Sequence, residues 1–126
     1  MIEVNGERMN NLPYRYAQFD MNLAWEIRQE AGESVVEGMG KNVRYAFMEG
    51  IEIWITAVDA AGKAGARKAC FVIPRQVKLD GTFPFSVKLP VPLEQGMPLK
   101  FTYKYNGSDG GDGGMNWMQS FEWTVP

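Results

Sequence analysis

The chain contains no histidine and only one cysteine among its 126 residues. The absence of histidine excludes Ser–His–Asp and Cys–His catalysis and most zinc sites. A single cysteine cannot form an internal disulfide, so a hydrophobic core has to stabilise the fold. Cys70 lies in the apolar run from 69 to 73, which predicts a small buried side chain. It is not expected to act as a nucleophile, because no histidine is present to activate it.

Long apolar runs and an excess of basic residues are missing too. No run approaches the roughly 18 apolar residues of a transmembrane helix, so membrane insertion is not expected. The first residues lack the basic start and apolar stretch of a signal peptide, which predicts a cytoplasmic location if the chain is complete. Lys and Arg number 13 against 15 Asp and Glu, for a net charge of −2. Nucleic acid is therefore not an expected partner.

The clearest positive signal is an alternation of apolar and polar residues from 17 to 27. A period of two over this length predicts one extended strand with a buried and a solvated face. Asp20 and Glu26 fall on the solvated face of that strand. The predicted buried face consists of Ala17, Phe19, Met21, Leu23, Trp25 and Ile27. Because antiparallel sheets can leave one face in water, the pattern favours an antiparallel sheet protein.

Turn signals recur at intervals of about eight to twelve residues, and no segment has a convincing helical period. The sequence therefore predicts an all-β, antiparallel β-sandwich of about nine or ten strands. It is expected to form one domain over residues 1–126. The strands are expected at 2–4, 15–28, 34–37, 43–48, 51–58, 67–73, 83–89, 99–105 and 116–125, with turns at 5–6, 38–42, 49–50, 59–63 and 80–81. Pro84 inside a strand indicates a sheet edge or a strand start.

Residues 23–73 resemble the immunoglobulin-like domains of the PKD type. The resemblance rests on Trp25, the segment 43–47, Gly50, the strand 51–58, and the hairpin at Asp59 and Gly62. It implies an immunoglobulin-like part over about residues 17–74, with residues 75–126 adding strands to the same sandwich. Domains of that kind usually serve as binding or spacer modules. The resemblance therefore implies a non-enzymatic role.

An enzyme without histidine would depend on carboxylate chemistry, as glycosidases do. The candidates are Asp20, Glu26, Asp59 and Asp80. Each has a simpler explanation, because the first two fall on a solvated strand face and the last two in turns. A carboxylate glycosidase is accordingly the least favoured function, and no catalytic residue is predicted.

The most unusual local composition is the Gly-rich segment from 106 to 114. Its Asn106, Asp109 and Asp112 supply closely spaced oxygen atoms of the kind that calcium binds. The segment resembles the glycine–aspartate calcium repeats of secreted toxins, although it occurs only once. The alternatives are a flexible loop between strands and a mobile binding loop. Calcium is therefore a possible cofactor.

Aromatic residues near this segment indicate a second kind of site. The stretch from 83 to 107, with the later Asn116-Trp117, resembles starch-binding modules, which stack aromatic rings on sugars. The predicted ligand-binding residues are Trp117, Tyr105, Trp54, Asn106 and Asn116. The ligand would be a carbohydrate or a protein surface. The aromatic residues could equally be part of the core.

Charge distribution favours an alternative, a structural or assembly subunit such as a phage or surface component. Acidic residues prevail in 1–66 and basic residues in 67–126, so the two halves could attract each other between subunits and form an oligomer. Lys88, Lys100 and Lys104 are expected on one outer face. They would either prevent edge-to-edge aggregation or bind an acidic partner.

Overall fold

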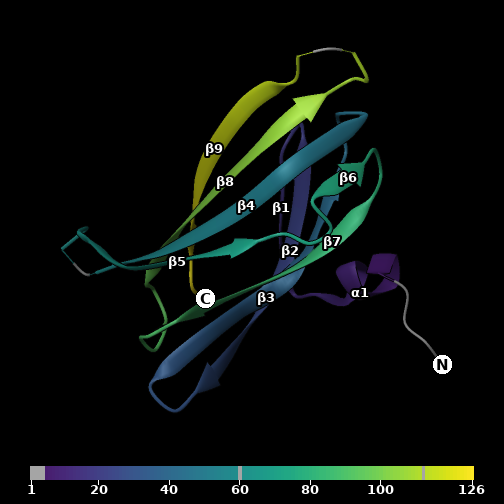
Figure 1. The fold of residues 1–126 in the computed structure, drawn as a ribbon. Coiled ribbons are helices and arrows are strands. Elements are labelled where there is room, and N and C mark those ends of the chain that lie inside the picture. The colour runs from purple at the N-terminus through teal and green to yellow at the C-terminus, as the bar shows by residue number, and fades with distance from the viewer. Residues whose placement is uncertain (1–4, 60, 112) are drawn as a thin grey trace.

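The computed structural model describes residues 5–59, 61–111 and 113–126. Two antiparallel sheets pack face to face (Figure 1). The four-stranded sheet has the order β1 (Tyr14–Ala17), β2 (Met21–Glu30), β3 (Glu33–Asn42) and β7 (Thr82–Leu89). The five-stranded sheet has the order β5 (Ala64–Phe71), β4 (Phe47–Val58), β8 (Pro98–Ser108) and β9 (Met115–Thr124), and β6 (Gln76–Lys78) also pairs with β4. The predicted strand at 2–4 lies outside the described residues.

The core lies between the two sheets and is formed by the inward-facing residues of both. Trp25 from β2 is fully buried, and its ring packs 4.6 Å from that of Phe101 in β8. Alternate residues of β7 and β8 are buried in the same way, as expected for strands with one face on a core. The prediction of an all-β antiparallel sandwich is confirmed. In the described part of the chain, no helix has the length and apolar character needed to cross a bilayer.

The predicted long strand at 15–28 is two strands. β1 ends at Ala17, the chain turns through residues 18–20, and β2 begins at Met21. The backbone N–H of Gln18 donates to the carbonyl of Met21 and closes this hairpin. The turn reverses the expected faces, since Phe19 is 54% exposed and Asp20 is fully buried. Alternation continued through a turn because the turn residues happen to have the same polarity pattern as the strands.

A short helix, α1 (Asn5–Asn11), occupies the segment in which a turn was predicted at 5–6. Met9 and Leu12 pack on Ala24 of β2 and Met39 of β3. This contact buries Ala24 completely, although the alternation placed it on a solvated face. Figure 1 shows α1 beside the four-stranded sheet. The outer face of that sheet is therefore partly covered.

The guanidinium of Arg15 lies at the C-terminal end of α1. Its Nη2 atom is 3.2–3.3 Å from the backbone carbonyls of Met9, Asn10 and Leu12. The Met9 carbonyl also accepts from the N–H of Leu12 at 3.4 Å. Carbonyls at the end of a helix lack i+4 partners, and a cation here also complements the helix dipole. Arg15 thereby fixes α1 against β1.

β3 continues through the segment 38–42, where a turn was predicted. Gly38 lies opposite Trp25 of β2 and Phe85 of β7, and Gly40 lies opposite Leu23 and Phe83. A Cβ atom on Gly40 would lie 2.2 Å from the Phe83 ring. Gly38 instead allows the backbone of β2 to approach closely. Both glycines are therefore strand residues at points of close approach, and not turn residues.

β4 likewise runs through Gly50, where another turn was predicted. The pairing of β4 with β8 shifts between Glu49 and Glu52, and Gly50 has a φ of 61°. This is a β-bulge, for which a left-handed glycine is well suited. Residues 43–46, predicted as part of a strand, precede β4 as a loop.

Other local predictions hold. Asp59 accepts hydrogen bonds from the backbone N–H groups of Ala61 and Lys63, and so forms the predicted hairpin turn. Asp80 has a φ of 65° in the turn before β7, and Pro84 lies on β7 at the edge of the four-stranded sheet. Cys70, by contrast, is half-buried and not fully buried.

Candidate functional site

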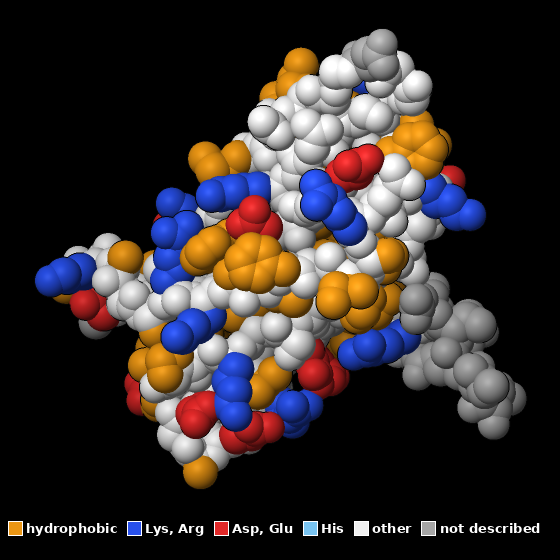
Figure 2. All heavy atoms as spheres, in the orientation of Figure 1, with side chains coloured by type: hydrophobic (Ala, Val, Ile, Leu, Met, Phe, Trp, Pro, Cys, Tyr) orange, Lys and Arg blue, Asp and Glu red, His pale blue; other side chains and the backbone are white. Residues whose placement is uncertain are grey.

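Three cross-strand rows of side chains occupy the middle of the outer face of the five-stranded sheet. The first row is Phe71, Glu52, Lys104 and Met118; the second is Ala69, Trp54, Thr102 and Ser120; the third is Arg67, Thr56, Lys100 and Glu122. The first row ends in two hydrophobic side chains that are 66% and 63% exposed, Phe71 and Met118. Figure 2 shows small hydrophobic patches on this side of the molecule with Lys and Arg beside them.

Trp54 occupies the middle of this surface. Its Nε1 donates to Glu52 at 3.0 Å, which fixes the orientation of the indole. The guanidinium of Arg67 lies 4.5 Å from the ring centroid, and the Nζ atom of Lys104 lies 5.6 Å from it. Phe71 meets the ring edge-on at 6.5 Å. We call Trp54, Arg67, Phe71, Lys104 and Met118 the Trp54 surface.

A hollow of about 480 Å³ adjoins the first row. It is present because the bulge at Gly50 separates the first row from the next one, which consists of Glu49, Asn106 and Asn116. Arg75 also lines it, and the N–H of Gly50 donates to the Arg75 carbonyl at 2.9 Å. The hollow offers two carboxylates, two cations and two amides, and can therefore hydrogen-bond groups of either charge.

Four of the five predicted ligand-binding residues border this hollow: Tyr105, Asn106, Asn116 and Trp117. Asn106 donates to Asn116 across the two strands at 3.1 Å. The hydroxyl of Tyr105, however, points into the core and donates to Asp20. Trp117 is half-buried, and its ring meets Phe19 edge-on at 6.0 Å. The fifth residue, Trp54, is on the same outer face beside Lys104.

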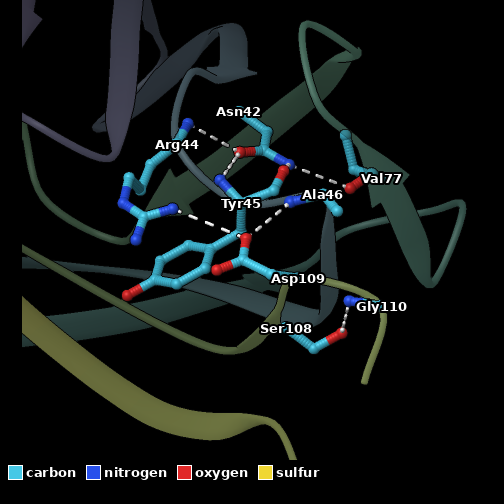
Figure 3. Close-up of polar contacts among 8 residues, drawn as sticks. All are labelled: Asn42, Arg44, Tyr45, Ala46, Val77, Ser108, Asp109 and Gly110. Carbon is cyan, nitrogen blue, oxygen red and sulfur yellow. Dashed lines mark hydrogen bonds and ion pairs between the residues drawn. The ribbon is translucent and has the colours of Figure 1, made fainter.

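The Gly-rich segment is held to the loop before β4 by Asp109 (Figure 3). Its Oδ1 atom accepts a hydrogen bond from the N–H of Ala46 at 3.3 Å and lies 3.5 Å from Nη1 of Arg44. Asp112 lies outside the described residues, and no group of three acidic or cysteine side chains suited to a metal occurs in the part that is described. Calcium binding by Asn106, Asp109 and Asp112 stays a prediction.

Buried Asn42 positions the same loop (Figure 3). Its Nδ2 donates to the carbonyls of Tyr45 and Val77, and its Oδ1 accepts from the N–H groups of Arg44 and Tyr45. All of the hydrogen-bonding capacity of the amide is thus directed at backbone. The loop that contacts the Gly-rich segment is therefore fixed by β3 and β6.

A second buried polar group connects the two sheets. The Asp20 carboxylate accepts a hydrogen bond from the Tyr103 hydroxyl at 2.7 Å and one from the Tyr105 hydroxyl. Burial, together with the hydrogen bond to Asp20 and its charge, raises the pKa of both tyrosines well above the usual value of 10. Asp20 was predicted to face solvent. That prediction is wrong, because the turn at 18–20 directs its side chain inward.

The tyrosines should make the fold sensitive to alkali. Below pH 10 both residues are protonated in the folded and the unfolded chain. Above it the unfolded chain ionises first, so the folded state holds more protons and stability falls as pH rises, by about 1.4 kcal/mol per pH unit for each tyrosine. Urea unfolding at increasing alkaline pH measures this slope. Tyr105→Phe removes one titrating group and should roughly halve it; an unchanged slope would contradict the assignment.

The four acids considered for catalysis lie in different places. Asp20 is buried with its oxygens bound by tyrosines. Glu26 lies on β2 opposite Glu37, Asp59 is in the turn after β4, and Asp80 is in the turn before β7.

Lys88, expected beside Lys100 and Lys104, is on the four-stranded sheet and pairs with Glu30 and Glu33. The structure thus separates the lysines that the sequence grouped together.

No protein-family model and no curated protein matches the sequence. Among solved structures, the GAE domain of GGA2p from Saccharomyces cerevisiae is similar, with a TM-score of 0.57 and 11% identity over 90% of this chain and 96% of that one. The yeast GGA1 GAE domain–P21 structure also has a TM-score of 0.57, with 6% identity over 88% and 96% of the two chains. At such identities the likeness is one of fold.

These similarities confirm the immunoglobulin-like sandwich but do not point to the PKD type in particular. The site residues that sequence reasoning missed are Arg67, Phe71 and Met118. Their signal was present, since each is in phase with the outward side of its strand. That these three side chains share one surface could be recognised only from the pairing of β5 with β4 and of β9 with β8.

Proposed function

We propose that the chain is a non-enzymatic module that binds a segment of a partner protein on the Trp54 surface. The observation that carries the proposal is the first row, in which two well-exposed hydrophobic side chains flank Glu52 and Lys104. Exposed hydrophobic residues beside polar groups are typical of protein interaction sites. Phe71 and Met118 would contact apolar side chains of the partner, and the adjoining hollow would receive a polar one.

Charges on this surface specify the partner further. Arg67 and Lys104 both lie over Trp54, and Lys100 follows in the third row. The segment best suited to them carries a carboxylate next to its apolar residues. A cation that is already held over an aromatic ring loses little freedom when it pairs with such a group.

The arrangement supports a protein ligand better than a sugar. Sugar stacking needs an open aromatic face, and here Arg67 and Lys104 lie over the Trp54 ring while Trp117 packs against Phe19. A non-enzymatic role is supported by the absence of histidine and by the separation of the candidate acids. The similarity to GAE domains concerns the fold and assigns no ligand to this chain.

A displayed library of random peptides, selected on the immobilised chain, tests the proposal. Selected peptides should combine apolar and acidic residues. Their affinity should fall about tenfold for Phe71→Ala, because the removed side chain is a large part of the exposed apolar contact. Lys104→Glu should lower the affinity for acidic peptides in particular, because it places a carboxylate opposite theirs.

The matched control is Phe19→Ala, which removes an equally large exposed aromatic from the turn between β1 and β2. This variant should bind the selected peptides as the native chain does. The proposal is wrong if Phe71→Ala and Lys104→Glu leave peptide binding unchanged, or if a glycan array yields ligands while the peptide library yields none.

A further inference from the structure

The four outer strands of the two sheets differ in how their edges are protected. β1 has only four residues and carries Arg15, whereas β7 contains Pro84 and Lys88. β5 carries Arg67 and Lys68, and its pairing with β4 is interrupted by a register shift. Short length, proline, lysine and bulges are the features by which sheet edges avoid pairing with another chain. Three edges of the sandwich therefore have such protection.

The fourth edge, β9, has none of these features. Its ten residues, Met115–Thr124, contain no lysine, arginine, proline or glycine and only one charged residue, Glu122. All ten pair with β8 in one continuous register, and no other described strand pairs with β9. Met115 and Met118 are 59% and 63% exposed along it. The strand thus presents a long, regular row of unpaired backbone groups with apolar side chains beside them.

We propose that β9 pairs with β9 of a second copy of this chain, antiparallel across a two-fold axis. The composition of β9 favours a second copy. With Ser120 of the two copies opposite each other, Met118 of one copy lies opposite Glu122 of the other, and Asn116 opposite Thr124. This register places no like charges opposite each other across the interface, which would otherwise destabilise the pairing.

Ring contacts on the inner face of β9 fix the position of this strand. Phe121 stacks on Tyr16 with ring centroids 3.9 Å apart, and Trp123 packs on Tyr14 at 4.7 Å. Tyr14 and Tyr16 belong to β1, which contacts the inner side of β9 through these rings and does not pair with it. An edge strand that is already held by such contacts loses little conformational entropy when it pairs.

Pairing would join the two five-stranded sheets into one continuous sheet. The strand order β5-β4-β8-β9 would continue into β9-β8-β4-β5 of the second copy. Both Trp54 surfaces would then lie on the same side of that sheet. A dimer would therefore present two identical binding surfaces to one partner and gain avidity without a new contact.

Light scattering coupled to size exclusion, over a wide range of concentrations, tests the pairing. The native chain should reach twice its monomer mass of 14.2 kDa. Ser120→Lys and Ser120→Glu should each remain monomeric, because each places like charges opposite one another at the two-fold axis. Mixing the two variants should restore the dimer. Since both variants lose the hydrogen bond between Ser120 and Thr102, this rescue cannot come from a repaired fold.

Ser86→Lys is the matched control, because Ser86 is exposed on β7, the protected edge of the other sheet. It should dimerise as the native chain does, and so should Phe71→Ala, whose defect concerns partner binding alone. A native chain that stays monomeric at every concentration would overturn the proposal. So would a dimer that persists in Ser120→Lys, or two charged variants that fail to associate on mixing.

Discussion

Replacement of Asp20 by Ala is expected to lower the free energy of unfolding by about 4 kcal/mol. The substitution removes the carboxylate to which the Tyr103 and Tyr105 hydroxyls donate, and takes the acceptor from both buried donors. A buried donor without a partner costs about 1 to 3 kcal/mol, and here there are two. Urea unfolding at neutral pH, monitored by tryptophan fluorescence, measures the loss.

Asp20→Asn is the matched control for this substitution. The amide has nearly the same shape and can still accept one tyrosine hydrogen bond, while the other hydroxyl can rotate to accept one. Its cost should be about 1 to 2 kcal/mol, which corresponds to the weaker hydrogen bonds of a neutral group. Equal losses for the Ala and Asn variants would show that the charge dominates. A loss below about 1 kcal/mol for Asp20→Ala would show that the tyrosines find other partners.

Gly38→Ala is expected to be as damaging, at about 3 to 5 kcal/mol, although it adds only one methyl group. A Cβ atom on Gly38 would lie 1.9 Å from the carbonyl oxygen of Ala24 and 2.7 Å from the Cα of Trp25. Both atoms are backbone, so no side chain can rotate away. The β2–β3 pair would have to separate at the centre of the sheet, below the most deeply buried tryptophan.

The control for this prediction is Gly111→Ala in the Gly-rich segment. A Cβ atom there has no neighbour within 4 Å, and Gly111 is not among the glycines with positive φ. Thermal unfolding of the two variants should differ strongly, with Gly111→Ala close to the native chain. Similar melting temperatures would mean that β3 can shift without cost, contrary to the close packing around Gly38.

The strands with regular alternation could be predicted from the sequence because each buries one face. β7 follows this rule along its whole length and β8 does so except at the buried Thr102, and the predicted edge position of Pro84 is confirmed. α1 could not be predicted, since a helix of seven residues leaves too short a pattern for a helical period. Its stability comes from tertiary contacts of Met9 and Leu12 with the sheet.

Glycines were misinterpreted for a physical reason. Gly38, Gly40 and Gly50 were assigned to turns, because glycine is commonest there. In the structure Gly38 lets the backbone of β2 approach closely, Gly40 makes room for the Phe83 ring, and Gly50 permits a bulge. Which of these roles a glycine has depends on what lies across the sheet from it, and the sequence does not specify strand pairing.

The buried acid had a signal that was overlooked. Tyr103 and Tyr105 are in phase with Phe101 on the inward side of β8. Both hydroxyls therefore require a hydrogen-bond acceptor inside the protein. Asp20 is an acid near apolar residues, but it was predicted to face solvent. The alternation of apolar and polar residues was read as one strand, although it continues through the turn at 18–20. Of the predicted ligand-binding residues, Asn106 and Asn116 border the hollow and Trp54 lies on the same outer face, while their role in binding stays a prediction. Phe71 and Met118, the hydrophobic residues at the two ends of the first row, were recognised only from the strand pairing.

The hydrogen bonds of Asp20 also determine when the fold can be completed on the ribosome. They join residues 83 and 85 positions apart in the chain. At about 5 to 20 residues per second, the first hairpin waits roughly 4 to 17 seconds for β8 to be synthesised. During that interval Asp20 is hydrated, and Trp25 of β2 lacks the rings of β8 and β9 on which it packs. The nascent chain is therefore most exposed to misassociation before β8 emerges, and the connection between the sheets marks the end of that period.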